Sequence, residues 1–259
     1  MYKYDAKPER RGRRSRKKKR KKRIQLFLNF SMLVCIVMVI FRIGVLENRE
    51  NMAYDVRMDS GQTSDDFVQG WELTLVNKWN PLPEGAEAEI IELSNGERVD
   101  KRIYPYLQEM FDDARAEGIY PIVRSGYRTR QEQTDIYEER MQRYQADGLT
   151  EAEARTETEL WVAVPGTSEH ELGLAVDINA DRIHSGSEEV YAWLGRHAHL
   201  YGFINRYPSD KTDITGVANE PWHYRYVGTA AAAEIYERGI CLEEYLEDYH
   251  ADDATLMHR

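Results

Sequence analysis

One apolar segment of 23 residues, 24–46, constrains what this chain can form more than any other feature. It contains a single charged residue, Arg42, and it is long enough to cross a bilayer core of about 30 Å as one helix. The segment before it, residues 1–23, carries 14 Lys and Arg against two acidic residues, whereas acidic residues follow it. We therefore expect a single-pass membrane anchor with a cytoplasmic N-terminus and an extracytoplasmic remainder.

Two other interpretations of this N-terminal region compete with a membrane anchor. A basic run can bind nucleic acid, but the apolar segment directly after it favours membrane orientation, so we expect no nucleic-acid partner. A cleaved signal peptide competes with an uncleaved anchor, but the apolar run is long and no small-residue cleavage site follows it closely. The two cysteines, Cys35 and Cys241, lie in the predicted anchor and beyond it, which excludes a disulfide framework.

The rest of the chain divides by composition into a linker and one domain. Residues 47–70 are polar and poorly periodic, which is typical of a stalk between a membrane and a folded unit. From Trp71 apolar residues alternate with turn residues, and we expect a single domain over 71–250, followed by a short tail, 251–259. The sequence does not define an oligomeric state.

Helical and strand patterns are mixed within this domain. Capping boxes at Thr129 and Thr150 open two helices, and apolar residues at helical spacing indicate others. The expected helices begin near residues 104, 129, 150, 187, 229 and 241, and the expected strands lie within 119–127, 174–178 and 222–228. Without a regular strand and helix repeat, this order predicts an α+β domain, a small antiparallel sheet flanked by helices.

The stretch VPGTSEHELGLAVDIN, residues 164–179, places a charged residue in an apolar strand pattern. On a strand, Leu174, Val176 and Ile178 point to one face, and Asp177 points to the other. Gly173 allows a close turn that brings His170 back over the strand end. Because an isolated buried charge costs several kcal/mol, Asp177 requires a partner or a metal ion.

A second pair of candidate residues occurs in ANEPWHYRYVG, where Glu220 precedes His223 by three positions. Two His, one Asp and a further carboxylate are the residue set of a catalytic zinc site with an open position and a general base. The competing interpretation is a structural hydrogen bond between a His and Asp177. We expect the remaining five histidines to be solvated: His184, His197, His199, His250 and His258.

A third element is RSGYRTRQEQ, in which Arg124, Arg128 and Arg130 cluster in an otherwise acidic domain. Arg128 lies in a turn after a predicted buried strand, where its guanidinium could enter a cleft and bind a carboxylate through two hydrogen bonds. An ion pair with one of the many surface acids is the alternative.

Together, SGYRTRQEQ, TSEHELGLAVDI, HLYGFINRYP and EPWHYRYVG resemble the VanY-type D-alanyl-D-alanine carboxypeptidases. These belong to a group of zinc peptidases that includes lysostaphin-like enzymes and the zinc domain of sonic hedgehog. The resemblance covers about residues 75–246. It implies that His170, Asp177 and His223 are the zinc ligands. It further implies that Glu220, Arg128, Gln133 and Ser168 take part in catalysis or substrate binding.

In that resemblance, Glu220 is the catalytic base and Arg128 polarises the scissile carbonyl and anchors the substrate. Gln133 and Ser168 match positions that help to hold the terminal carboxylate of the substrate or groups near the metal. The implied reaction is zinc-dependent hydrolysis that removes the terminal D-alanine from peptidoglycan stem peptides. An L,D-carboxypeptidase, a peptidoglycan endopeptidase and a non-catalytic zinc module that binds wall peptides remain alternatives.

Overall fold

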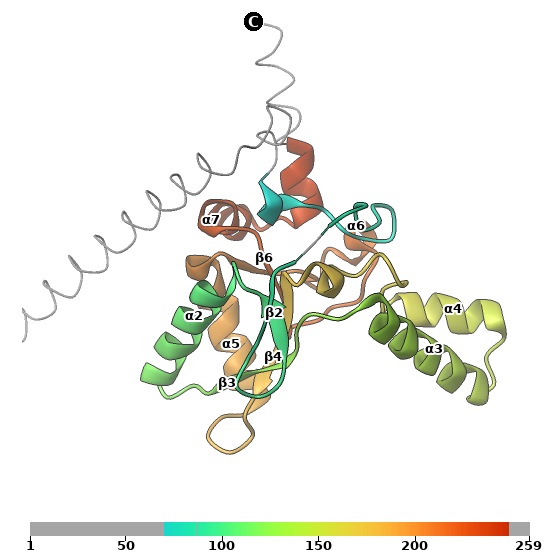
Figure 1. Ribbon diagram of the computed structural model, residues 1–259, viewed down its shortest axis with the longest axis horizontal. Coiled ribbons are helices and arrows are strands. Elements are labelled where there is room, and N and C mark those ends of the chain that lie inside the picture. Colours follow the sequence, from blue (N-terminus) through green and yellow to red (C-terminus); the bar gives the residue numbers. More distant parts are fainter. Residues whose placement is uncertain (1–69, 87, 249–259) are drawn as a thin grey trace, which may run out of the picture. The chain divides into compact units, whose positions relative to one another are not determined.

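The structure is a computed structural model, and it describes residues 70–86 and 88–248 (Figure 1). The predicted basic tail, anchor and stalk, together with the C-terminal tail, lie outside the described residues, apart from Gly70 of the stalk. None of the helices within the described ranges is long and apolar enough to cross a membrane.

A four-stranded antiparallel sheet forms the centre of the domain, in the order β3-β4-β6-β5. Its strands are β3 (Pro121–Ser125), β4 (Ala175–Ala180), β6 (His223–Tyr226) and β5 (Phe203–Asn205). A separate antiparallel hairpin joins β1 (Ile90–Glu92) to β2 (Arg98–Asp100) and was not predicted. The prediction of an α+β domain with a small antiparallel sheet is confirmed.

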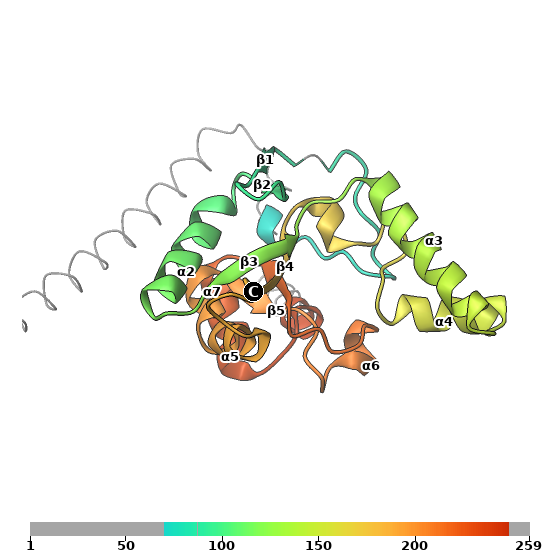
Figure 2. The same ribbon diagram turned by 90° about the horizontal axis from the view of Figure 1, so that it is seen from below.

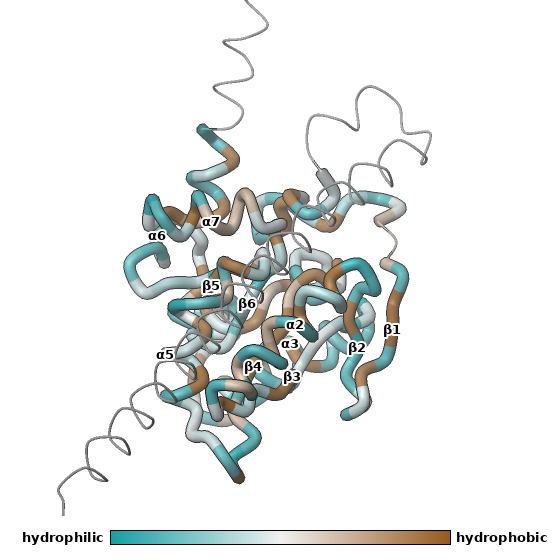
Figure 3. The backbone as a smooth tube through the Cα atoms, turned by 90° about the vertical axis from the view of Figure 1, so that its left-hand side faces the viewer, coloured by the Kyte–Doolittle hydropathy of each residue, from teal (hydrophilic) through white to brown (hydrophobic). Residues whose placement is uncertain are grey.

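One face of this sheet packs against the main hydrophobic core. Val176 and Ile178 of β4, with Tyr224 of β6, are buried there beside residues of the helices α2 (Tyr104–Ala116) and α5 (Ser187–His197). Because strand side chains alternate, Asp177 and His223 fall on the opposite face of the sheet. Along the tube in Figure 3 the colour changes back and forth between hydrophobic and hydrophilic, as expected for elements that bury one side.

A second core joins the C-terminal helices to the sheet. The helix α7 (Thr229–Arg238) and the helical residues 242–248 bury Ile235 and Leu242 against Ile204 of β5. Shorter helical turns complete the domain: η2 (Trp71–Leu73), η3 (Glu169–Leu172), η4 (Ala198–Tyr201) and α6 (Thr212–Thr215).

The helices α3 (Arg130–Ala146) and α4 (Glu151–Glu159) form a pair that lies on the other side of the domain from α2 and α5 in both Figure 1 and Figure 2. Each begins at a capping box as predicted, with Thr129 and Thr150 as the N-caps. Gln133 is the one buried residue of α3, so this helix leaves most of its surface outside the core.

The expectation that five histidines are solvated is partly wrong. His184 is exposed and pairs with Asp181, but His197 and His199 are half-buried. The ring of His197 lies against Trp193, and that of His199 stacks on Tyr236, because imidazole packs as an aromatic surface as well as a polar group. His250 and His258 lie outside the described residues.

Candidate active site

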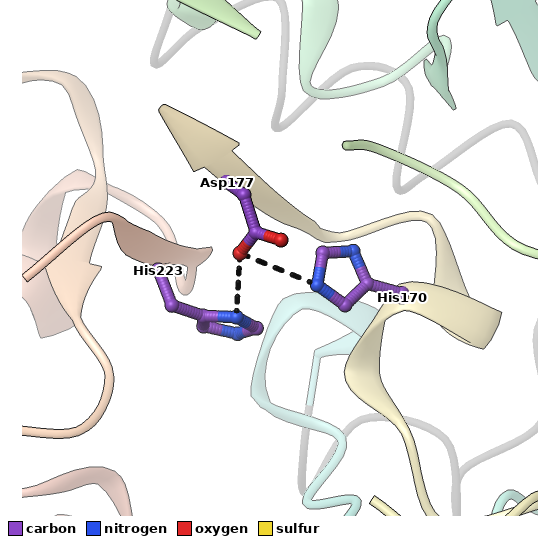
Figure 4. A group of neighbouring side chains, drawn as sticks. All are labelled: His170, Asp177 and His223. Carbon is purple, nitrogen blue, oxygen red and sulfur yellow. Dashed lines mark hydrogen bonds and ion pairs between the residues drawn. The ribbon is translucent and has the colours of Figure 1, made fainter. Parts of the chain in front are cut away.

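Three side chains far apart in the sequence converge at one point on the polar face of the sheet (Figure 4). The Oδ1 atom of Asp177 lies 3.5 Å from Nε2 of His170 and 3.1 Å from Nδ1 of His223. One ligand atom from each of the three residues lies within 4.8 Å of the other two. The structure therefore brings together the three residues that the sequence analysis selected as metal ligands.

Local geometry accounts for this convergence. Asp177 and His223 are direct partners in the register between β4 and β6, so their side chains leave the sheet side by side. His170 approaches from η3, which ends at Gly173 in the left-handed conformation with φ +73°. A non-glycine residue adopts that φ only with strain, so the glycine enables the turn that returns His170 to the strand.

Hydrogen bonding fixes which nitrogen of His170 is available. Its Nδ1 lies 2.7 Å from the carbonyl oxygen of Gly126, which can only accept, so Nδ1 carries the proton and Nε2 presents its lone pair to the site. Burial, assisted by the charge of Arg128, lowers the pKa of His170 to about 4. At neutral pH the ring is therefore neutral, as a metal ligand must be.

His223 is held between two carboxylates. Its Nδ1 lies 3.1 Å from Asp177, and its Nε2 lies 3.5 Å from Oε2 of Glu169. Burial alone would lower the pKa of His223, but hydrogen bonding to Asp177 and Glu169 raises it to about 9. A pKa of about 9 makes this ring an imidazolium at neutral pH, so a metal ion that binds Nδ1 would displace a proton.

Glu169 belongs to a buried charged network that the sequence analysis missed. Its Oε1 accepts hydrogen bonds from Nε of Arg206 at 2.8 Å and from Nη1 of Arg225 at 2.9 Å. Arg206 also forms two hydrogen bonds with Glu243. The side chains of these two arginines and two glutamates are all buried, and their charges cancel. The second carboxylate oxygen of Glu169, Oε2, has no partner within the network and faces His223.

Glu220 lies beside the three converging residues but is not one of the three that could hold a metal ion. Its Oε2 is 3.7 Å from Nδ1 of His223, and its side chain is buried in the wall of the cleft. Burial raises the pKa of Glu220 to about 7, although the positive charges of His223, Arg128 and Arg140 oppose this rise. A carboxylate with a pKa near neutrality can both accept and return a proton at physiological pH.

Arg128 lies in the same cleft and is held from three sides. It donates to Oδ2 of Asp177 at 3.2 Å, to Oγ of Ser125 at 3.0 Å and to Oε1 of Gln133 at 3.1 Å. Gln133 is fully buried and donates in turn to the carbonyl oxygen of Ala163. Ser168 is buried and lines the cleft, two residues before His170.

These residues open into a cleft of about 600 Å³. Its floor holds His170, Asp177 and His223, and Arg128 and Glu220 line it as well. Residues of α3 and Trp161 line the same cleft. A volume of this size is that of a ligand site and is large enough for several residues of a peptide.

This α+β domain carries a His-Asp-His cluster, a nearby carboxylate and an open cleft, which together are typical of the active site of a metallopeptidase. Residues 96–229 match the VanY family, described as D-alanyl-D-alanine carboxypeptidase. A D-alanyl-D-alanine carboxypeptidase of Enterococcus faecalis is 58% identical over 203 residues, which cover 78% of this chain and 74% of that protein. The chain belongs to the VanY family of D-alanyl-D-alanine carboxypeptidases.

Solved structures of this family are also similar. VanYB in complex with D-alanine-D-alanine is 62% identical, with a TM-score of 0.68, and the match covers 68% of this chain and 98% of that chain. A mutant of the vancomycin-resistance D,D-pentapeptidase VanY, from a VanB-type cassette and in complex with Zn(II), is 62% identical with a TM-score of 0.67. That match covers 68% of this chain and 99% of the other.

Proposed function

We propose that this chain is a zinc-dependent D,D-carboxypeptidase that removes the terminal D-alanine from peptidoglycan stem peptides. The observation that carries this proposal is the convergence of His170, Asp177 and His223 beside the buried carboxylate of Glu220. Two relatives support the substrate, because one is named a D-alanyl-D-alanine carboxypeptidase and the other was solved in complex with D-alanine-D-alanine. A third, solved in complex with Zn(II), supports the metal.

The three converging side chains fit a zinc ion. Bonds of about 2.0–2.2 Å in a tetrahedral site separate neighbouring ligand atoms by about 3.3 Å. Oδ1 of Asp177 lies 3.5 Å and 3.1 Å from the two imidazole nitrogens, close to that spacing. His170 Nε2, Asp177 Oδ1 and His223 Nδ1 would hold the ion, and three protein ligands are the number typical of catalytic zinc sites.

The chain's own residues supply the proton transfers and hold the substrate. A bound zinc ion supplies Lewis acidity, which activates water and polarises the scissile carbonyl. Glu220 takes a proton from the attacking water and passes it to the leaving amine of D-alanine. Arg128 donates a hydrogen bond to the carbonyl oxygen, where negative charge develops as the tetrahedral intermediate forms.

Gln133 and Ser168 support this arrangement. The amide oxygen of Gln133 fixes one branch of the Arg128 guanidinium, and its amide nitrogen is fixed by Ala163, so Gln133 orients Arg128 toward the substrate. The hydroxyl of Ser168, on the cleft wall, is placed to donate to the substrate's terminal carboxylate.

Defined stem peptides test the reaction. The zinc-loaded protein is expected to release D-alanine from a pentapeptide stem and to leave a tetrapeptide stem uncut. Cleavage of the tetrapeptide instead supports the L,D-carboxypeptidase alternative, and cleavage of cross-linked dimers supports the endopeptidase. Glu220→Ala should retain zinc and lose the activity, whereas full activity in this variant would refute the assignment of the base.

The non-catalytic zinc module is the weaker alternative. A structural zinc site has four protein ligands and needs no base, whereas three ligands converge here next to Glu220. A wild-type protein that binds zinc and stem peptides without releasing an amino acid would favour that module.

The N-terminal region completes the proposal. Residues 24–46 anchor the protein as a single transmembrane helix, 1–23 stay in the cytoplasm, and 47–70 form a stalk that holds the domain, 71–250, at the cell wall. The apolar length and the basic flank of 24–46 support this placement. Protease added to intact protoplasts should remove the domain and spare an N-terminal tag, and protection of the domain would contradict it.

A further inference from the structure

The cleft has a second wall that the proposed chemistry does not use. Ile136, Arg140 and Tyr144 of α3 line it, and Trp161 after α4 lines it as well. The α3 residues follow Gln133 at intervals of three, four and four, so all lie on one face of the helix. A helix rises about 1.5 Å per residue, which places Arg140 about 10 Å along α3 from Gln133, the partner of Arg128.

Arg140 is unusual among the cleft-lining and buried arginines because no carboxylate neutralises it. Arg128, Arg206 and Arg225 each pair with a carboxylate, whereas the side chain of Arg140 makes no hydrogen bond or ion pair within the described part of the chain. Its side chain is half-buried in the cleft wall, and its positive charge acts to lower the pKa of Glu220. In an acidic protein, an arginine kept unpaired in a substrate cleft is available for an anion on the substrate.

The two flanking side chains suit a peptide. Trp161 and Ile136 remain 40% and 37% exposed, although both are large and hydrophobic. Both line the same cleft as Arg140, so they offer an apolar surface to the part of the substrate that crosses it.

We propose that Arg140, flanked by Ile136, Tyr144 and Trp161, binds a second carboxylate of the substrate, upstream of the scissile bond. This inference rests on the proposed function. An extended peptide advances about 3.3–3.6 Å per residue, so a group about 7–10 Å from the scissile carbonyl belongs to a residue two or three positions before it. A stem peptide has a free carboxylate there, on its γ-linked D-glutamate.

The terminal carboxylate is the other anion that Arg140 could bind. It lies one residue beyond the scissile carbonyl, within about 4 Å of it, and the proposed function assigns it to Ser168. Substrates that differ only in the upstream carboxylate separate the two possibilities.

Three substrates and two variants make the test. The substrates are L-Ala-γ-D-Glu-L-Lys-D-Ala-D-Ala, the same peptide with the glutamate carboxylate amidated, and diacetyl-L-Lys-D-Ala-D-Ala. The variants are Arg140→Gln and Arg143→Gln, and Arg143 is an exposed arginine of the same helix that does not line the cleft. Release of D-alanine gives kcat and KM for each pair, and thermal unfolding checks that both variants fold.

On the acidic pentapeptide, Arg140→Gln should lower kcat/KM by about tenfold to a hundredfold, mainly through KM, as for a lost charge-assisted hydrogen bond. On the other two substrates Arg140→Gln should change kcat/KM by less than about twofold, because these substrates lack the upstream carboxylate. Arg143→Gln should leave kcat/KM unchanged for all three substrates, because Arg143 does not line the cleft. Amidation should lower kcat/KM for the wild type by the same factor. The proposal is overturned if Arg140→Gln affects all three substrates equally or affects none. A wild type that releases no D-alanine from any of them contradicts the proposed function itself.

Discussion

Replacing Glu169 by Gln tests whether the buried network prepares His223 for zinc. The variant keeps the size of the side chain and one oxygen, but it removes the negative charge. Arg225 then loses the single carboxylate that contacts it in the described structure, while Arg206 keeps Glu243. Removing one partner from a buried ion pair costs about 3–5 kcal/mol, and the retained amide oxygen places the expected loss near the lower end.

The same change acts on the metal site. Oε2 of Glu169 lies 3.5 Å from Nε2 of His223, and neither atom has another hydrogen-bond partner. A carboxylate behind a ligating histidine orients the ring and makes it more basic, and loss of such a partner weakens metal binding by about 10–100-fold. Competition against a chromophoric chelator measures the zinc affinity, and thermal unfolding measures the stability with and without zinc.

Glu171→Gln is the matched control. Glu171 is also a buried carboxylate of η3, but it pairs with Arg130, whose side chain is 58% exposed, and has no contact with His223. We expect it to leave zinc affinity within about twofold, because it removes no contact of His223. Equal zinc affinities in the Glu169 and Glu171 variants would refute the role assigned to Glu169.

Arg128, Gly173 and Glu243 each hold a position whose loss can be measured. Arg128→Lys should lower kcat/KM by about 10²–10³ with zinc retained, because a lysine cannot reproduce the forked contacts, and unchanged kinetics would contradict this. Gly173→Ala should lower the free energy of unfolding by about 1–3 kcal/mol, because φ is +73° and a Cβ would lie 3.1 Å from the Asp100 nitrogen; an unchanged Tm argues against it. Burial alone would raise the pKa of Glu243, but Arg206 lowers it, so this pair stabilises the fold above the ordinary pKa of 4.5 and loses that effect as the pH falls through the lowered pKa. The Tm of Glu243→Gln should therefore fall less than that of the wild type between pH 6 and about pH 3, and parallel curves would refute the pairing.

Much of the site could be predicted because its signals are local in the sequence. The alternation through Val176, Asp177 and Ile178 indicates a strand with one polar position, and Gly173 indicates the turn that returns His170. The capping box at Thr129 likewise defines the start of α3. Each of these patterns is set by the backbone within a few residues, so one sequence suffices to detect it.

The missed features depend on contacts between distant parts of the chain. Arg206 and Arg225 contact Glu169 across 37 and 56 residues, and as sequence letters they are indistinguishable from solvated surface charges. The hairpin of β1 and β2 escaped because its strands have three residues each, too short to show alternation. Arg140 was missed for a related reason: α3 is polar on nearly all sides, and the face that lines the cleft is defined by Trp161 and the sheet.

Anomalous diffraction at the zinc edge, from crystals of the zinc-loaded domain, tests whether His170, Asp177 and His223 bind one zinc ion. We expect one strong peak bonded at about 2.0–2.2 Å to Nε2 of His170, Oδ1 of Asp177 and Nδ1 of His223, with Glu220 near the ion and uncoordinated. A peak held by other residues, or one in which Glu220 closes the coordination as a fourth protein ligand, would contradict it.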